Sequence, residues 1–160
     1  MGTLRRTLLL LLAFLLQTTW IQSLQILDIA PDLIVVTLVL IALVVDPVES
    51  ILMALVVGLL QDTYLPQNLG LNAMVNVLVV LTVGLMRIGI VVDNLRVQVA
   101  FVVAAVLLHD LIYFVGYSGV PLAEVPFFWL RYAVGRAVYS ALLGMAISYA
   151  LLLRHRLVPA

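Results

Sequence analysis

The stretch LNAMVNVLVVLTVGLMRI, residues 71–88, decides the fold class, because it carries no charge before Arg87 and is long enough to cross a bilayer as one helix. Such stretches fill the chain. Of its 160 residues, 66% are hydrophobic and only 10% are charged, and the mean hydropathy is +1.28. A soluble domain needs a polar surface that this composition cannot supply. The sequence therefore predicts an all-α integral membrane protein.

Six hydrophobic stretches separated by short polar turns predict one transmembrane domain over residues 1–160, a six-helix bundle. A helix needs ~20 residues to cross a hydrocarbon core of ~30 Å, so about six fit in this length. The first is interpreted as an uncleaved span because no small-residue cleavage site follows it. The second is short for a span. The expected spans are 7–27, 31–45, 51–65, 71–88, 96–117 and 126–153.

Pairs of arginines indicate how the bundle is oriented. With six spans, three such pairs fall on one side of the membrane, and an excess of basic residues marks that side as cytoplasmic. Both termini are then cytoplasmic. The acidic turn of Asp46 and Glu49 lies on the same side, but acidic residues count little in this rule. The pairs are Arg5 with Arg6, Arg87 with Arg96, and Arg154 with Arg156.

Ionisable and amide side chains gather in the outer half of the predicted bundle. A charged group within a span costs ~2.5–3.5 kcal/mol on insertion scales, so it normally faces protein or water. We therefore predict a buried polar network in which Asp62 and Asp110 are the counter-ions of Arg131 and Arg136. The alternative is that Arg131 and Asp62 are interfacial and extend to water. The network, either structural or binding, comprises Asp62, Asn72, Asn76, Asp110, Arg131 and Arg136, with His109 beside it.

Small residues recur at helical spacing in the third and sixth stretches, which allows helix backbones to approach closely. Packing within the bundle is one explanation, and a stripe that receives the transmembrane helix of another protein is the other. The stripes are Ala133, Ala137 and Ala141; Ser140, Gly144 and Ser148; and Ala54 with Gly58.

The sequence contains no recognisable catalytic or metal-binding arrangement. The chain has no cysteine, which excludes disulfides and thiolate metal sites. His109 and Asp110 are adjacent and so lie on different helix faces, and neither Ser118 nor Ser140 has a base at useful spacing. The charge is balanced and no basic stripe exists, so nucleic acid is not an expected partner. We predict no catalytic, cofactor-binding or metal site, and no cofactor.

Two segments carry a resemblance to a known family. Gly58-Leu59-Leu60-Gln61-Asp62 is followed by Leu69-Gly70-Leu71-Asn72, and Pro31-Asp32 opens the second stretch. Together with the chain length and the number of spans, this pattern resembles MreD, the bacterial rod shape-determining membrane protein family. The family-like motif is Pro31, Asp32, Gly58, Asp62, Leu69 and Gly70. One departure is the acidic turn of Asp46 and Glu49, where the family often has basic residues.

The resemblance implies a non-enzymatic scaffold of the cell-elongation complex in the bacterial inner membrane, surrounded by lipid. It implies direct binding to the single-span protein MreC and links through the complex to MreB, RodA and the elongation transpeptidase, in support of side-wall peptidoglycan synthesis. The family also resembles the substrate-binding membrane component of energy-coupling-factor transporters, a likeness of fold alone. The alternative function is a small-molecule binding or transport component, with a cavity among Asp62, Arg131 and Arg136.

Overall fold

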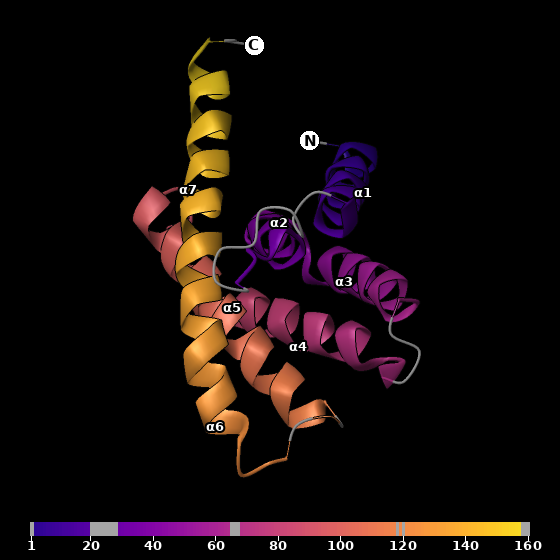
Figure 1. Cartoon of the computed structure of the whole chain (residues 1–160). Helices are drawn as coiled ribbons and strands as arrows, with labels where there is room; N and C mark the ends of the chain where they lie inside the picture. The colour runs from indigo at the N-terminus through magenta and orange to yellow at the C-terminus, as the bar shows by residue number, and fades with distance from the viewer. Residues whose placement is uncertain (1, 20–28, 65–67, 118, 120, 158–160) are drawn as a thin grey trace.

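The computed structural model describes residues 2–19, 29–64, 68–117, 119 and 121–157, and every regular element among them is helical. Five helices are followed by a composite sixth rod (Figure 1), so the predicted all-helical class with six rods is confirmed in this part. The helices are α1 Thr3–Thr19, α2 Leu33–Ala42, α3 Pro47–Asp62, α4 Leu71–Met86 and α5 Leu95–Gly116. The sixth rod consists of α6 Val125–Phe128, the π-helical segment η3 Trp129–Ala133 and α7 Val134–Leu157.

The third helix begins earlier than the expected range of 51–65. The Asp46 carboxylate accepts a hydrogen bond of 2.9 Å from the backbone N–H of Val48, and Pro47 occupies the first turn. Both are helix-starting features, because proline lacks an N–H that the first turn would leave unpaired. The stretch 46–50, expected as a turn, is therefore mostly helix. Residues 20–27 of the expected first span and the turn residues 66–67 lie outside the described part of the chain.

Helix α2 lies at the centre of the bundle, in contact with α1, α3, α4, α5 and α7 (Figure 1). Its ten residues extend about 15 Å at 1.5 Å per residue, shorter than the expected range of 31–45. Ile34, Val36 and Val39 have no exposed surface. A helix that is apolar on all sides is suited to a central position.

The sixth rod is not one regular helix, as the range 126–153 had predicted. Five residues, Trp129–Ala133, form a π-helical segment within it. Such segments are uncommon and often occur at functional sites. The Trp129 Nε1–H donates a hydrogen bond of 2.9 Å to the carbonyl oxygen of Leu107 in α5, which ties the irregular segment to the bundle.

The small-residue stripes face inward. A Cβ atom on Gly144 would lie 3.5 Å from side-chain atoms of Val36 and of Val102, so α7 approaches α2 and α5 closely there. The stripes therefore serve packing within the bundle, while the side chain of Ser148 lies outside the described part. The buried members are Ala54, Gly58, Ala133, Ala137, Ser140, Ala141 and Gly144.

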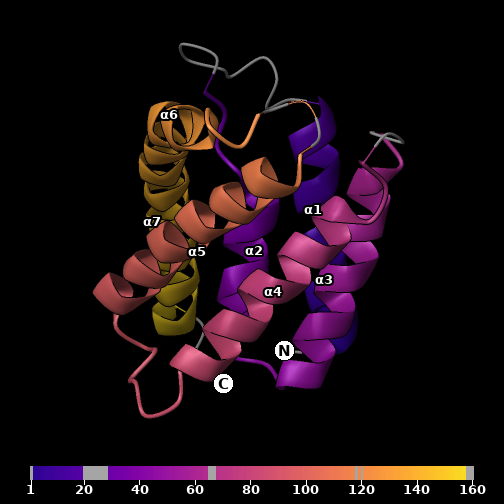
Figure 2. The same cartoon turned by 90° about the horizontal axis from the view of Figure 1, so that it is seen from below.

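Contacts at one end of the bundle involve residues that the sequence places on the cytoplasmic side. Figure 2 shows the N-terminus, the α2–α3 turn and the α4–α5 turn toward one end and the α3–α4 and α5–α6 connections toward the other. Arg6 forms an ion pair of 3.3 Å with Glu49, and Arg87 Nη1 donates to the carbonyl oxygen of Ala42 at 2.8 Å. Glu49, the departure from the family pattern, thus neutralises an arginine at this end.

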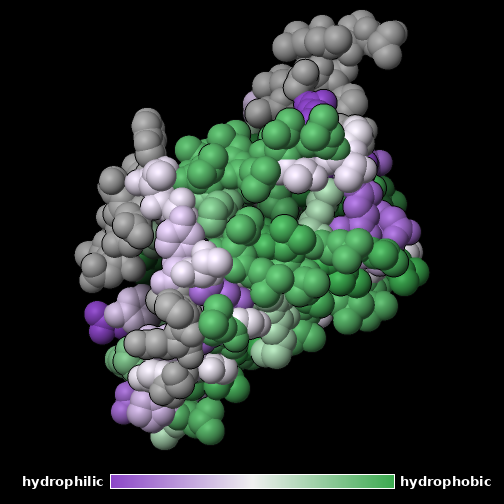
Figure 3. Space-filling model, turned by 90° about the vertical axis from the view of Figure 1, so that its right-hand side faces the viewer, coloured by the Kyte–Doolittle hydropathy of each residue, from purple (hydrophilic) through white to green (hydrophobic). Residues whose placement is uncertain are grey.

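The outer surface of the bundle carries many large apolar side chains. Figure 3 shows an apolar band across the middle of one face, with hydrophilic residues gathered at its two edges. Leu8, Leu52, Val56 and Leu142 are each more than half exposed. In the described part, Leu95–Gly116 is the one helix long and apolar enough to cross a membrane by itself, and Leu33–Ala42 and Leu71–Met86 are shorter apolar helices.

Candidate functional site

The first polar centre is the carboxylate of Asp62, the last residue of α3, which has no exposed surface. Its Oδ2 accepts hydrogen bonds from the backbone N–H groups of Gly70 at 2.9 Å and Ala73 at 3.2 Å. Its Oδ1 accepts from the backbone N–H and the Nδ2 of Asn72, both at 3.0 Å. The first N–H groups of a helix have no partner within it and carry partial positive charge. Asp62 therefore caps α4 from the neighbouring helix.

Two glycines make this cap possible. A Cβ atom on Gly58 would lie 2.3 Å from the Cα of Ala73, so only glycine permits the close crossing of α3 and α4. Gly70, the N-cap residue of α4, has a φ of +89° and no side chain that could cap the helix. Leu69 is 69% exposed and takes no part in the cap. Gly58, Asp62 and Gly70 of the family-like motif thus act together: they hold the start of α4 against the end of α3.

The predicted arginine partner of Asp62 is wrong. Among the described residues Asp62 forms no ion pair, and its four acceptor positions are occupied by N–H groups. A carboxylate near the C-terminal end of its own helix needs compensation, and the start of α4 supplies it instead of a cation.

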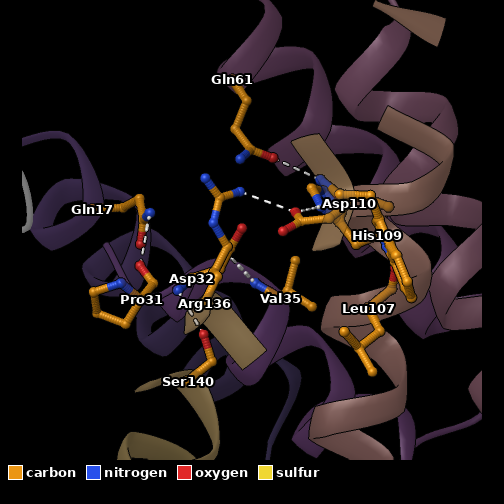
Figure 4. Close-up of polar contacts among 12 residues, drawn as sticks. Gln17, Pro31, Asp32, Val35, Gln61, Leu107, His109, Asp110, Arg136 and Ser140 are labelled. Carbon is orange, nitrogen blue, oxygen red and sulfur yellow. Dashed lines mark hydrogen bonds and ion pairs between the residues drawn. The ribbon is translucent and has the colours of Figure 1, made fainter. Parts of the chain in front are cut away.

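The second polar centre joins α5 to α7. Arg136 Nη1 lies 3.0 Å from Asp110 Oδ1, which is the predicted pairing, and Figure 4 shows the guanidinium reaching toward this carboxylate. His109 Nδ1 lies 3.3 Å from the same oxygen. The His109 ring stacks on Tyr113, with centroids 6.2 Å apart. Asp110 is buried whereas the Arg136 side chain is 32% exposed, so the pair lies at the edge of the interior.

Amide side chains form a third contact between α3 and α4. Asn76 Nδ2 donates to Gln61 Oε1 at 2.6 Å, and Asn76 has no exposed surface. Four buried polar atoms lack a hydrogen-bond partner among the described residues: Arg6 Nε at one end of the bundle, and Asn76 Oδ1, His109 Nε2 and Asp110 Oδ2 in these centres. The predicted network is therefore three separate contacts, of which none involves Arg131.

Arg131 lies outside the network. It is exposed, and its guanidinium carbon lies 5.4 Å from the centroid of the Tyr132 ring. No ion pair joins it to an acidic residue in the described part of the chain. The alternative interpretation of Arg131 as a residue that faces outward agrees with this position, whereas its predicted role as a counter-ion is wrong.

The motif Pro31-Asp32 starts α2 and connects it to α7. Asp32 Oδ1 accepts from the backbone N–H of Val35 at 2.9 Å, as an N-cap does. The backbone N–H of Asp32 donates to Ser140 Oγ at 2.9 Å, a contact between residues 108 positions apart. Gln17 Nε2 donates to the carbonyl oxygen of Pro31 (Figure 4). Its Oε1 accepts from the backbone N–H of Leu33.

Sequence reasoning missed four of these contributors, namely Gln17, Gln61, Trp129 and Ser140. Each donates or accepts a hydrogen bond between helices. An uncharged polar side chain inside an apolar stretch was the available signal, because its hydrogen-bonding groups need partners when buried. The pattern alone does not indicate which partner each side chain finds.

An open cavity of about 490 Å³ lies between α1, α2, α3 and α4. Its described lining combines amides and hydroxyls with apolar groups and includes no charged side chain. None of Asp62, Arg131 and Arg136 lines it, so it is not where the sequence had placed a solute site. The lining residues are Phe14, Gln17, Thr18, Ile34, Gln61, Tyr64 and Asn72.

The described residues offer no group of three or more histidines and acidic residues that could hold a metal ion. Asp110 lies between His109 and Arg136. One histidine and one carboxylate beside a guanidinium do not form a set of metal ligands. Ser140 is occupied by the N–H of Asp32. Ser118 lies outside the described residues, as does the side chain of His155.

Residues 3–157 match the family model described as rod shape-determining protein MreD. The matched range begins at the first residue of α1 and ends at the last residue of α7, so it includes all the polar contacts above. No curated protein and no solved structure matches the chain.

Proposed function

The chain belongs to the MreD family of rod shape-determining proteins, and we propose that it is a non-enzymatic, multi-pass scaffold of the bacterial inner membrane. In this proposal it binds MreC directly. Through the elongation complex it is linked to MreB, RodA and the elongation transpeptidase. It thereby supports side-wall peptidoglycan synthesis and cell shape.

The proposal rests on one observation. The polar groups of the interior cap helices or join them, while the outer surface carries many large apolar side chains. Asp62 and Asp32 cap helices, and Asp110 pairs with Arg136. These contacts hold the bundle together and leave no assembled set of reacting groups among the described residues. A rigid bundle of this kind is suited to present a surface to a partner.

The apolar surface supports a position within the bilayer. Large exposed apolar residues occur on α1, α3, α4 and α7, for example Leu8, Leu52, Leu78 and Leu142. Monomeric soluble proteins rarely expose apolar patches of this extent. The helices α1, α3 and α4 have 16 or 17 residues. At 1.5 Å per residue they extend about 25 Å, which is close to the hydrocarbon thickness.

Topology is testable because the chain has no cysteine. Four exposed apolar residues, each at least 66% exposed, are replaced singly by cysteine: Val48, Leu69, Val91 and Leu122. Intact cells are then treated with a membrane-impermeant maleimide. We expect labelling of Leu69→Cys and Leu122→Cys, and labelling of Val48→Cys and Val91→Cys only after lysis. Equal labelling of all four in intact cells would contradict a multi-pass arrangement.

Partner binding is tested by co-expression with the MreC homologue of the same organism and purification in detergent through a tag on MreC. We expect the chain to co-purify. Alanine substitutions of the exposed leucines on α1, α3, α4 and α7 then locate the interface, and substitutions that matter should cluster on one face. Failure to form a complex, together with normal rod shape after depletion of the chain, would reject the proposal.

The cavity favours a second candidate function, the binding of a small neutral solute. Its volume lies in the range of ligand pockets, and amide groups of Gln17, Gln61 and Asn72 line it. Binding would raise the unfolding temperature in proportion to the logarithm of solute concentration. Glucose and N-acetylglucosamine are suitable probes, with Gln61→Leu as the variant that should lose the effect. The absence of any shift for these probes would favour the scaffold alone.

A further inference from the structure

An arginine is exposed among bulky apolar side chains near the start of the sixth rod. Arg131 lies in η3, and its neighbours Phe127 and Leu130 are each 64% exposed. One turn further, Val134 is 44% exposed. The Tyr132 ring lies beside the guanidinium. The rod thus presents one cation on a surface that is otherwise apolar and aromatic.

This cation differs from the other arginines whose side chains are described. Arg6 pairs with Glu49, Arg87 with a helix carbonyl and Arg136 with Asp110. Arg5 and Arg96 lie near helix starts at the end of the bundle that carries the N-terminus. Arg131 is at the opposite end and has no acceptor for its N–H groups in the described part of the chain. An anion from outside the chain would supply one.

The charges nearby leave room for such an anion. Glu124, the N-cap residue of α6, precedes Arg131 by seven residues, about 10 Å along a helix axis, and no ion pair joins the two. A guanidinium presents five N–H donors in one plane, which match the oxygens of a phosphate. Aromatic side chains such as Phe127 and Tyr132 are typical of the interface between acyl chains and headgroups.

We propose that Arg131, with Tyr132 beside it, binds the phosphate of an anionic lipid headgroup. The lipid lies on the non-cytoplasmic face of the inner membrane. This inference rests on the proposed position in the membrane. A lipid fits better than a second protein helix, because close helix approach requires small residues. The described small-residue stripes of this rod face inward, whereas Phe127 and Leu130 face out. Flexible acyl chains can pack around such bulky side chains.

The chain contains a reporter for this site. It has two tryptophans, Trp20 and Trp129, and Trp129 lies two residues before Arg131. In a Trp20→Phe background, Trp129 fluorescence is measured in vesicles that contain either brominated phosphatidylcholine or brominated phosphatidylglycerol. Bromine quenches tryptophan at short range, so the quenching reports which lipid lies next to Trp129. We expect phosphatidylglycerol to be enriched about fivefold over phosphatidylcholine, from the typical effect of one basic residue near an anionic surface.

Variants separate the site from general electrostatics. Arg131→Gln should abolish the enrichment, so that the two lipids quench about equally. Arg131→Lys should retain most of the enrichment, and Arg96→Gln should leave it unchanged. Equal quenching by both lipids would overturn the site while leaving membrane insertion intact. Displacement by excess inorganic phosphate would overturn the lipid assignment in favour of a free anion. Quenching by neither lipid would contradict the membrane position itself.

Discussion

Replacement of Asp62 by asparagine tests the cap of α4 most directly. The carboxylate accepts four hydrogen bonds, two on each oxygen. An asparagine retains one oxygen and replaces the other by an NH2 group that faces two N–H donors. Two charge-assisted hydrogen bonds are then lost at ~1.5–3 kcal/mol each. The lower desolvation cost of a neutral amide offsets part of this loss.

We therefore expect Asp62→Asn to lower the free energy of unfolding by about 3 kcal/mol. For a chain of this length, 1 kcal/mol corresponds to a shift of ~2–4 °C in the unfolding temperature, so the decrease should be about 6–12 °C. The assay is thermal unfolding in mild detergent, followed by circular dichroism. Asp93→Asn is the matched control, because Asp93 is exposed in the turn between α4 and α5 and should shift the temperature by less than about 2 °C.

Hydrogen exchange locates the effect. The amides of residues 70–73 should exchange faster in Asp62→Asn, because their acceptor is weakened, while the amides of α7 should not change. A double-mutant cycle with Arg131→Gln separates the cap from an ion pair: the cap predicts additive effects, and an ion pair predicts coupling. Equal unfolding temperatures for Asp62→Asn and Asp93→Asn, or clear coupling to Arg131, would refute the cap.

Three further predictions use the same unfolding assay. Gly58→Ala should destabilise the bundle by at least the ~1–3 kcal/mol of an overpacked core. Gly84→Ala is the control and should be neutral or stabilising, because a Cβ there meets nothing within 4 Å. Equal effects of the two substitutions would contradict the close crossing of α3 and α4. Arg136→Gln should cost near the lower end of ~3–5 kcal/mol, because it leaves Asp110 buried without its cation, and adding Asp110→Asn should recover part of the loss; no recovery would contradict the pairing. Ser140→Ala should cost ~1–3 kcal/mol by leaving a buried N–H without an acceptor, and a change below about 0.5 kcal/mol, the size of a surface effect, would count against that contact.

The sequence was informative where a single physical rule decides the outcome. Uninterrupted apolar stretches predicted six helical rods, and Arg136 pairs with an acidic residue, as expected of a cation within a span. The start of α3 was misplaced because Asp46 and Pro47 were interpreted as a turn, although the same residues start helices. Turn and helix-start signals share residue types, so the flanking pattern alone did not distinguish them.

Asp62 shows why the polar contacts were harder to predict. A buried carboxylate can be satisfied by a cation or by the N–H groups at a helix start, and the sequence offers both: arginines in the sixth stretch and the start of the fourth. The choice depends on how closely α3 approaches α4, which Gly58 sets. Arg131 was assigned inward because its counter-ions were assumed to lie within the chain. Its exposure depends on the irregular turn of η3, which the sequence did not reveal.

The central position of α2 has a consequence for the order of assembly. The ribosome synthesises α2 second, whereas α5 and α7, which cover part of it, are synthesised last. The backbone N–H of Asp32 has no acceptor in α7 until Ser140 has been added. In the proposed membrane position, lipid takes the place of its missing neighbours until then, which an all-apolar helix permits. The bundle therefore cannot close progressively from its N-terminus. A chain cut short before the sixth rod would leave the α7-facing side of its innermost helix uncovered, and that side would be open to capture by other helices or to quality-control proteolysis.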